Sequence, residues 1–493
     1  MQEPDADLLV VGGGIAGLAA AVSARQAGAS VILLERAARE DRGGNTRWTE
    51  AFMRMRSEDE VAHDFISHFT ANSGYHLDPA LVAETAADLD QRSAIGRTLP
   101  MTDPDVLATF ADAAGPTIGW LKSFGVRFDF LPSYLITTST TRLAPIGGGL
   151  ALVEALGNWA ETNGVDVRYQ TTARGLIQDA SGAVVGIKAI SGGSGGLGDI
   201  RARSVVLASG GFEGNPEMQA RYLGPQSRYL RPVARGGYYN KGEGIAMALG
   251  IGAAPAGDYT LFHAEPLDPR SGAAEPIVLV FNYGILVNRD GDRFIDEAPA
   301  TVDATYEAIT RVILQQPGGI AYTVLDARIE DVPGWQRSVR SDEPPVRAAT
   351  LEGLARALGI DPTRLAATVA AYNVACPGEA GFKPLEVDGL ITHAGYAPRK
   401  SNWARRIDRG PFLAYPIMCG NCFTFGGLKV DTSARVLDTS GVVIPGLYAA
   451  GETMGLYYGT YTGATSVLRG AVFGRIAGRH AASAAGHRGE QVR

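Results

Sequence analysis

The sequence predicts an α/β protein with more than one structural domain, and three observations support this prediction. An apolar run over residues 7–11 is typical of a buried parallel strand. The alanine-rich residues 15–27 are typical of a helix, and residues 30–34 read as a second apolar strand. The chain has 493 residues, more than one ordinary domain needs. We therefore expect a parallel sheet and two structural lobes.

A glycine pattern with the spacing GxGxxG lies between the first strand and the helix. The first glycine permits a tight turn, the second lets a pyrophosphate approach the backbone, and the third lets helix and strand pack closely. The helix N-terminus then faces the phosphates. Glu35 ends the second strand about 20 residues later, where a carboxylate can bind a ribose 2′-hydroxyl. This context favours a Rossmann-like dinucleotide site over a purely structural turn. The residues assigned to this site are Gly12, Gly14, Ala16, Gly17, Glu35 and Arg36.

A second glycine-acid turn lies near the other end of the chain. Residues 442–452, VVIPGLYAAGE, read as a strand that runs into Gly451 and Glu452. With this turn the chain resembles the flavoprotein family of fumarate reductase and succinate dehydrogenase over nearly its whole length. The resemblance implies one FAD held between the two ends of the chain. The motifs that carry it are residues 10–21 (VVGGGIAGLAAA), 43–48 (GGNTRW), 205–215 (VVLASGGFEGN), 240–253 (NKGEGIAMALGIGA), 284–297 (GILVNRDGDRFIDE) and 445–452 (PGLYAAGE).

The resemblance also implies a domain layout. It places a Rossmann-like FAD-binding domain of the glutathione-reductase type in residues 1–257 and 423–493, and an inserted α+β capping domain in residues 258–422. Residues 191–199, SGGSGGLGD, read as the tip of a hairpin. Residues 351–375 read as an amphipathic helical segment of the cap. We expect the substrate where cap, flavin and C-terminal loop meet.

By the same resemblance, further residues should contact FAD along the flavin edge, the sugar and the flavin carbonyl. No histidine occurs between Glu35 and His63, where membrane-bound members attach the flavin covalently, so we expect non-covalent FAD. No second strand-GxGxxG-helix unit for a nicotinamide is present. The further FAD contacts are Gly43, Gly44, Asn45, Thr46, Ala173, Gly210, Gly211, Glu243, Gly451, Glu452, Ser466, Val467 and Leu468.

The chain departs from the family where fumarate would bind. Fumarate reductases hold a dicarboxylate with two histidines and two arginines, one of which donates the proton. Only His263 matches this pattern. A threonine cannot replace a proton-donating guanidinium, so fumarate reduction is not expected. The other site positions and the two positions of the acid-arginine relay fall on Thr301, Phe423, Thr462, Val278 and Phe281.

Two subgroups resemble the chain more closely. The tricarballylate dehydrogenase type is similar in residues 305–326, 399–404 and 423–431 and in a Tyr-x-Gly loop. The 3-ketosteroid dehydrogenase type has a comparable loop tyrosine, with a backbone amide four residues on, that polarises a ketone. These would be Tyr461 and Thr465 here.

The C-terminal loop, residues 449–468 (AAGETMGLYYGTYTGATSVL), carries three tyrosines. Removing a proton next to a carbonyl requires donors that hold the enolate oxygen, and a tyrosine hydroxyl is a neutral, strong donor. We predict that Tyr461, with Tyr458, polarises the substrate oxygen or relays a proton, while His263 orients the substrate or receives charge. We assign Tyr457 to the substrate site. The alternatives are that Tyr457 and Tyr458 only pack the cap interface and that His263 is structural.

A carboxylate substrate would also need a cation. The candidates are Arg235, Lys400, Arg405 and Arg469, although each can equally be a surface or cap residue. We assign Arg235 to the substrate site together with Thr301, Phe423 and Thr462.

Composition excludes several function classes. Lys and Arg number 45 against 52 Asp and Glu, and a net charge of −7 disfavours nucleic acid. No apolar stretch approaches the ~20 residues of a membrane span. Three cysteines and an N-terminus without a signal-like segment indicate a cytoplasmic protein without disulfides. We expect no metal site and no catalytic role for the pair Cys419 and Cys422.

These observations predict an FAD-dependent dehydrogenase that desaturates, or reduces, a C–C bond next to a carboxylate or carbonyl of a small substrate. The tricarballylate dehydrogenase type is the leading interpretation, and the 3-ketosteroid or cyclic-ketone type is an alternative. A flavin subunit of an electron-transfer complex is another. Electrons would pass to a quinone, oxygen or a separate carrier protein.

Overall fold

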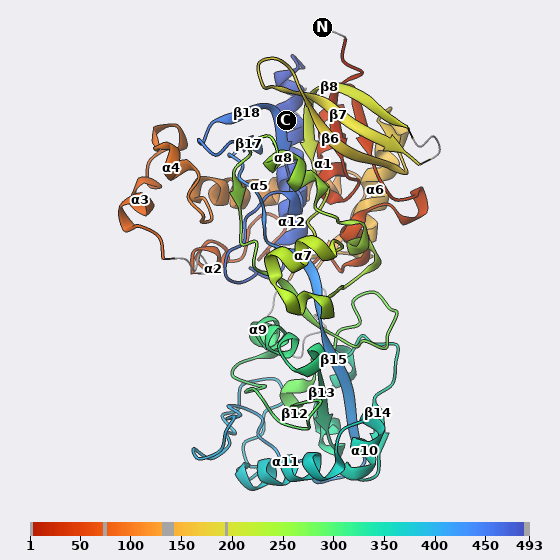
Figure 1. Ribbon diagram of the computed structural model, residues 1–493, viewed down its shortest axis with the longest axis vertical. Coiled ribbons are helices and arrows are strands. Elements are labelled where there is room, and N and C mark those ends of the chain that lie inside the picture. Colours follow the sequence, from red (N-terminus) through yellow and green to blue (C-terminus); the bar gives the residue numbers. More distant parts are fainter. Residues whose placement is uncertain (1–2, 72–75, 131–141, 193–195, 488–493) are drawn as a thin grey trace.

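The computed structural model describes residues 3–71, 76–130, 142–192 and 196–487. Their strands form two main sheets, which lie one above the other in Figure 1. The predicted hairpin tip at residues 191–199 lies partly outside the described residues, since residues 193–195 are not included. The helices are α1 (Ile15–Gln26), α2 (Phe65–Ala71), α3 (Pro79–Glu84), α4 (Ala94–Arg97), α5 (Pro104–Lys122), α6 (Gly148–Thr162), α7 (Pro216–Leu223), α8 (Glu243–Leu249), α9 (Val302–Leu314), α10 (Leu351–Leu358), α11 (Pro362–Ala375) and α12 (Ser466–Ala484).

The upper sheet has a parallel centre. Its strand order is β17-β18-β8-β1-β2-β5, with β7 and β6 added through β8. The five strands from β18 to β5 are parallel; β2 is buried throughout, β1 is buried except at Asp7, and β8 is buried over its last four residues. The strands are β1 (Ala6–Val11), β2 (Val31–Leu34), β5 (Asp166–Arg168), β6 (Thr171–Gln178), β7 (Val184–Ser191), β8 (Leu197–Leu207), β17 (Arg435–Leu437) and β18 (Val443–Ala449).

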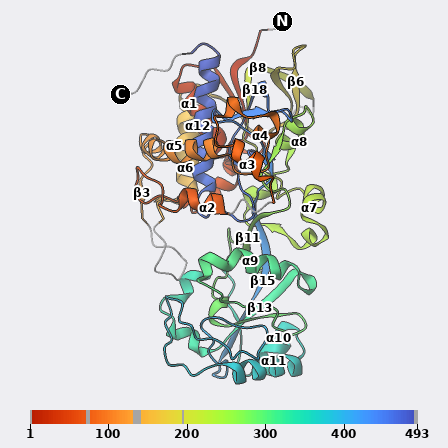
Figure 2. The same cartoon turned by 90° about the vertical axis from the view of Figure 1, so that its left-hand side faces the viewer.

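The two ends of the described chain meet in this upper part. Helix α12 packs along α1, and the two run side by side in both views (Figures 1 and 2). Glycine makes the approach possible, because a Cβ at Gly474 would lie 2.2 Å from the carbonyl oxygen of Ala16. A Cβ at Gly478 would lie 2.1 Å from the carbonyl oxygen of Ala20. Strand β18 joins the same sheet as β1, so residues beyond 434 complete the upper part.

The lower sheet is mainly antiparallel and centres on the long strand β15. Its order is β11-β15-β13-β12, with β14 and β9 also paired to β15. The predicted boundary between residues 422 and 423 falls inside β15, the long strand of Figure 1, and both residues line the cavity described below. The strands outside the upper sheet, which include those of the lower sheet and of two small two-stranded sheets (β3-β4 and β10-β16), are β3 (Phe128–Asp129), β4 (Ala144–Pro145), β9 (Arg231–Pro232), β10 (Pro255–Ala256), β11 (Phe262–Leu267), β12 (Ile285–Asn288), β13 (Ile320–Leu325), β14 (Val346–Ala348), β15 (Phe412–Thr424) and β16 (Gly427–Leu428).

Two details differ from the sequence prediction or add to it. Residues 351–375 form two helices, α10 and α11, rather than one segment. The break lies at Gly359, whose φ of 71° ends α10, and Pro362 starts α11.

The pairing of β11 with β15 contains a bulge at Cys422, because His263 pairs with Phe423 and Ala264 with Asn421. No helix in the described ranges is long and apolar enough to cross a membrane.

Candidate active site

A cavity of about 1290 Å³, its open mouth included, lies at the carboxyl ends of the parallel strands. Segments from both ends of the chain and from β15 line it. The predicted cofactor residues on its wall are Gly12, Gly14, Ala16, Glu35, Arg36, Gly44, Asn45, Thr46, Ala173, Gly210, Glu243, Gly451, Glu452, Ser466 and Val467.

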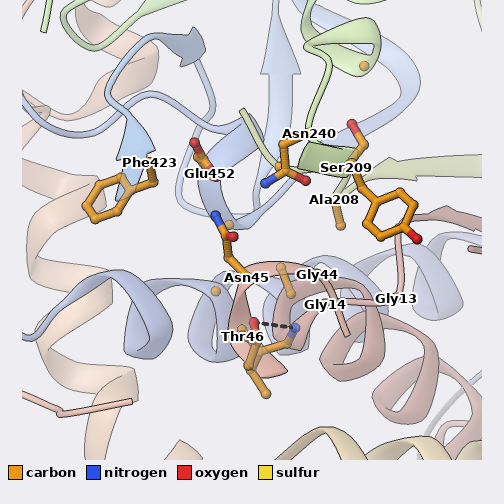
Figure 3. Close-up of a pocket in the computed structure, with 18 of the residues that line it drawn as sticks. Gly13, Gly14, Gly44, Asn45, Thr46, Ala208, Ser209, Asn240, Phe423 and Glu452 are labelled. Atoms are coloured by element: carbon orange, nitrogen blue, oxygen red, sulfur yellow. Dashed lines mark hydrogen bonds between the residues drawn. The ribbon is translucent and has the colours of Figure 1, made fainter. Parts of the chain in front are cut away.

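The glycine turn has the geometry that its spacing predicts. Gly12 has a φ of 107°, and a Cβ there would lie 2.3 Å from the carbonyl oxygen of Ala208. A Cβ at Gly17 would lie 1.8 Å from the carbonyl oxygen of Gly12, so this glycine serves helix packing and does not line the cavity. The hydroxyl of Thr46 accepts the N–H of Ile15 at 3.2 Å, which holds the segment of Thr46 against the start of α1 (Figure 3).

Glu35 is held at the end of β2 by the backbone. Its Oε2 accepts the N–H of Gly13 at 2.9 Å, and its Oε1 accepts the N–H of Ala37 at 2.8 Å. Burial raises the pKa of this carboxyl, and the two hydrogen bonds and the charge of Arg36 oppose that rise. Arg36 in turn pairs with Glu243 at 2.7 Å. The predicted ribose acid therefore lies on the cavity wall in a defined orientation.

Two further carboxyls, the buried Glu213 and the half-buried Glu452, belong to the part of the site where Asn45, Asn240 and Glu452 point toward the same space (Figure 3). Glu213 Oε1 accepts hydrogen bonds from the side-chain amides of Asn45 and Asn240, each at 2.6 Å. Burial and the nearby charge of Glu452 hold the pKa of Glu213 well above its usual range. Burial also raises the pKa of Glu452, whose Oε1 accepts the N–H of Thr424 at 2.7 Å. Sequence reasoning did not single out Glu213 or Asn240, although both lie in quoted motifs.

Besides Gly17, three predicted cofactor residues lie behind the wall rather than on it. Gly43 has a φ of 111° and packs against Val153. A Cβ at Gly211 would lie 2.0 Å from Glu452 Oε1, so this glycine makes room for the acid. Leu468 is fully buried in the core.

An aromatic cluster, formed by His263, Phe423, Tyr457 and Tyr461, adjoins the cavity through Phe423, which lines it. The ring centroids of His263 and Tyr461 are 4.4 Å apart, and those of Phe423 and Tyr461 are 5.0 Å apart. The Tyr457 ring lies 5.7 Å from Phe423, and its hydroxyl bonds Thr465 Oγ1 at 2.8 Å. The structure therefore brings together the predicted histidine and two of the three loop tyrosines.

The hydroxyl of Tyr461 lies at the start of α12. It accepts the N–H groups of Thr465 at 3.0 Å and of Ser466 at 3.1 Å, and it donates to Ser466 Oγ at 3.1 Å. One of the amides predicted to face a flavin carbonyl is thus bonded to Tyr461. Tyr461 and Thr465, the pair expected from the 3-ketosteroid dehydrogenase type to polarise a ketone together, are bonded to each other in the structure.

His263 is buried between two acids. Its Nε2 lies 3.4 Å from Glu265 Oε1, and its Nδ1 lies 3.7 Å from Glu307 Oε1. Burial lowers the pKa of His263, but the hydrogen bonds and charges of Glu265 and Glu307 outweigh burial and raise the pKa to about 9. The imidazole is therefore charged at neutral pH. Glu265 stands two residues from His263 on β11, on the same face, and strand periodicity could have identified it. No sequence signal marks Glu307.

His263, Glu265 and Cys422 also form a compact group. One ligand atom of each lies within 4.8 Å of the others. The β-bulge places Cys422 on this face, as bulges near active sites often re-aim a side chain. Histidine, carboxylate and thiolate are ligand types that zinc accepts. The three cysteines are free, and burial raises the pKa of Cys422 far above its usual range.

Four predicted catalytic or substrate residues are not brought to the cavity. The hydroxyl of Tyr458 accepts the N–H of Gly257 at 2.8 Å, in the buried loop packing. Thr462 Oγ1 bonds His68 Nδ1 at 3.2 Å, and Thr301 is the N-cap residue of α9. Arg235 pairs with Asp41, and its side chain is 64% exposed.

Of the other three cations considered as partners of a substrate carboxylate, two are bound away from the cavity and one lines it. Lys400 donates to the carbonyl oxygens of Asn282 and Gly284, and Arg405 pairs with Asp331. Arg469 lines the cavity, and its guanidinium lies 4.6 Å from the centroid of the Tyr457 ring. The two relay positions, Val278 and Phe281, are buried in the core of the lower sheet.

The parallel sheet, the glycine turn and the buried acid after β2 define a dinucleotide-binding protein. A family model described as an FAD binding domain matches residues 7–468, and the chain belongs to this family. A probable fumarate reductase from Shewanella frigidimarina (strain NCIMB 400) is 29% identical over 481 residues, which cover 96% of this chain and 74% of that protein.

Two solved structures are similar over nearly the whole chain. An open conformation of a flavocytochrome c3 fumarate reductase has a TM-score of 0.73 and 27% identity, covering 97% of this chain and 79% of that one. A 3-ketosteroid-Δ4-(5α)-dehydrogenase from Rhodococcus jostii RHA1, in complex with 4-androstene-3,17-dione, has a TM-score of 0.65 and 26% identity, covering 98% of each chain. The protein is an FAD-dependent oxidoreductase that acts on CH–CH or C=C bonds.

The cavity residues fit FAD. The buried hydroxyl of Ser209, on the cavity wall, has no hydrogen-bond partner in the described part of the chain, as expected of a group that meets a ligand. A Cβ at Gly44 would meet nothing within 4 Å, so its backbone borders open space. Helices α1 and α12 both begin at the cavity wall, where helix N-termini suit phosphate and carbonyl oxygens. Their first N–H groups, those of Ile15 and Ser466, are bonded to Thr46 and Tyr461.

Proposed function

We propose that the protein is a dehydrogenase that desaturates, or in the reverse direction reduces, a C–C bond next to the carbonyl of a small substrate. The observation that carries this proposal is the contact between Tyr461 and His263, whose ring centroids are 4.4 Å apart beside the cavity. A hydroxyl and a charged imidazole side by side can hold the oxygen of an enolate. One such preorganised donor contributes about 3 kcal/mol to catalysis.

The two residues have different tasks in this proposal. Two backbone N–H groups polarise the hydroxyl of Tyr461, which strengthens it as a donor. In this proposal the hydroxyl turns its one hydrogen from Ser466 Oγ to the substrate oxygen. His263, with a pKa of about 9, carries a proton at neutral pH and supplies positive charge to the same oxygen. Phe423 and Tyr457 exclude water around them.

FAD, when bound, accepts the hydride from the carbon next to the one that loses a proton. We propose that the glycine turn and Glu35 hold its adenosine half and that Glu452, Asn45 and the start of α12 surround its flavin half. The attachment is non-covalent in this proposal, since residues 36–62 contain no histidine. We also propose the layout of an FAD-binding domain at residues 1–257 and 423–493 with a cap at 258–422.

The charged groups around the cavity favour a ketone over a tricarboxylate. Among the predicted cations only Arg469 lines the cavity, so a tricarballylate-like substrate would lack partners for most of its charge. The second candidate is a substrate with a single carboxylate, because the buried guanidinium of Arg469 can bind one. In both candidates the electrons leave FAD to a quinone, oxygen or a separate carrier.

Anaerobic stopped-flow reduction of the bound flavin tests the proposal. Cyclohexanone derivatives and 3-ketosteroids should bleach the oxidised flavin, whereas tricarballylate and succinate should react much more slowly. If no ketone reduces the flavin and tricarballylate does, the preference for a ketone is wrong. If neither class reduces it, the dehydrogenase proposal fails.

A further inference from the structure

Glu275 occupies an unusual position on the cavity wall. It is buried, it lines the cavity together with Cys422, and its φ of 48° lies in the left-handed region. Residues other than glycine rarely adopt this conformation, and such backbone strain is concentrated at functional sites. The N–H of Glu275 donates to the carbonyl oxygen of Val233 at 3.2 Å, which helps to hold the strained turn.

A chain of charged side chains connects Glu275 with the surface. Its Oε2 accepts a hydrogen bond from Arg340 Nη1 at 3.0 Å. Another guanidinium nitrogen of Arg340, Nη2, lies 3.2 Å from Glu50 Oε1. The side chain of Arg340 is 26% exposed and that of Glu50 is 40% exposed, so the chain runs from the cavity to solvent. Three segments far apart in the sequence build it.

The surroundings of Glu275 suit a group that gains and loses a proton near neutral pH. Burial and the charge of Glu265 raise its pKa, Arg340 lowers it and Glu50 raises it, with a result of about 8. Other titratable groups line the same cavity, among them Glu35, Glu243, Glu452, Arg36 and Arg469. The thiol of Cys422, also on this wall, is neutral because burial raises its pKa. A general base performs best when its pKa is close to the working pH.

We propose that Glu275 exchanges the proton with the substrate carbon, and that Arg340 and Glu50 position it and connect it to solvent. This inference rests on the proposed function. In desaturation the C–H bond next to the carbonyl breaks, its electron pair stays on the substrate as the enolate, and the proton moves to the Glu275 carboxylate. The neighbouring carbon gives up a hydride to FAD, and the C=C bond forms. The route replaces the acid-arginine relay, whose expected positions are Val278 and Phe281.

The first experiment needs no turnover. Infrared difference spectra of the FAD-loaded protein, recorded between pH 6 and 10 in H₂O and D₂O, should show a protonated carboxyl that titrates near pH 8. This signal should be absent in Glu275→Gln and should titrate at higher pH in Arg340→Met, which removes the positive partner. Arg340→Lys should restore most of the wild-type profile. A titrating signal that persists in Glu275→Gln would overturn the inference.

The second experiment measures proton exchange without net oxidation. Cyclohexanone in D₂O is incubated with FAD-loaded protein, and NMR follows the exchange of its hydrogens next to the carbonyl. Glu275→Gln should slow the enzyme-catalysed exchange about 100-fold, and Glu275→Asp should recover part of it. Glu343→Gln, at an exposed acid outside the cavity, is the matched control and should exchange like wild type. Wild-type exchange in Glu275→Gln, or no exchange by wild type, would overturn the inference.

The two proposals can fail separately. If no ketone reduces the flavin but the protein still exchanges cyclohexanone hydrogens through Glu275, the proposed oxidation is wrong. The assignment of Glu275 as the proton-transfer group then stands. If ketones reduce the flavin equally fast in wild type and Glu275→Gln, the assignment of Glu275 as the proton-transfer group is wrong. The dehydrogenase proposal then stands.

Discussion

The hydroxyl of Tyr461 accepts the backbone N–H of Thr465 at 3.0 Å, four residues further along the chain. This bond closes the C-terminal loop on itself at the first turn of α12. It also aims the ring of Tyr461 at His263 and Phe423. The side chain of Tyr461 therefore connects the C-terminal loop, the start of α12 and Phe423 of the cavity wall.

Tyr461→Phe should keep FAD but lose most of its activity. The phenyl ring still packs on His263, whereas the donor to the substrate oxygen is lost. Loss of one such donor lowers kcat about 100- to 1,000-fold. Stopped-flow flavin reduction by a cyclic ketone measures the rate, and the flavin absorbance measures cofactor content. Tyr448→Phe is the matched control, because that hydroxyl bonds His480 and lies outside the aromatic cluster. Equal rates in Tyr461→Phe and wild type would move the chemistry elsewhere.

Glu35→Ala should weaken the retention of FAD. The substitution removes the acceptor of two backbone N–H groups and the predicted partner of the ribose hydroxyls. Hydrogen bonds to a charged group contribute about 1.5–3 kcal/mol, so the Kd for FAD should rise about 10- to 100-fold. Isothermal titration of the apoprotein with FAD measures the change. Glu40→Ala, an exposed acid five residues on, should bind FAD like wild type.

The charge of His263 should make stability depend on pH. Its folded pKa of about 9 lies above the ~6.5 of an unfolded histidine, so protonation stabilises the fold. The stabilisation is complete below about pH 6.5 and is lost as the pH rises to about 9; its full size is about 3 kcal/mol. Urea unfolding at several pH values measures it. His263→Gln should flatten the profile over this range, and an unchanged slope would contradict the assignment.

Added Zn²⁺ should inhibit flavin reduction, because it should bind to His263, Glu265 and Cys422 together. These three residues offer ligand atoms within 4.8 Å of one another beside the cavity. EDTA should restore the rate, and Mg²⁺, which prefers oxygen ligands, should have no effect. Cys422→Ser should lose most of the inhibition. Cys376→Ser, at a half-buried cysteine of α11's C-cap, serves as the control and should be inhibited like wild type.

Many residues of the cavity wall could be predicted from the sequence because their signals are local. A glycine at a turn, or an acid at the end of a strand, depends on the backbone conformation of only a few neighbouring residues. Gly12, Glu35 and Glu452 therefore lie where their motifs indicate. Gly17, Gly43 and Gly211 serve packing just behind the wall, since spacing alone does not distinguish a glycine that touches a ligand from one that supports it.

The substrate half depends on how loops and β15 pack, which sequence spacing does not reveal. Thr462 and Tyr461 are neighbours in the loop, yet only Tyr461 packs against His263. Arg235 was expected near the substrate but pairs with Asp41 at the surface. Glu275 belongs to no motif, and its importance comes from a strained turn and a distant arginine.

The packing of α12 against α1 also has a consequence for biosynthesis. Along the chain, α1 is synthesised long before Ser466 and Val467 of α12, which border the cavity. A nascent chain can form β1 and its glycine turn before α12 exists, and the side of α1 that packs against α12 stays uncovered until then. The wall that encloses the flavin is complete only once α12 has left the ribosome, so cofactor insertion follows the synthesis of α12.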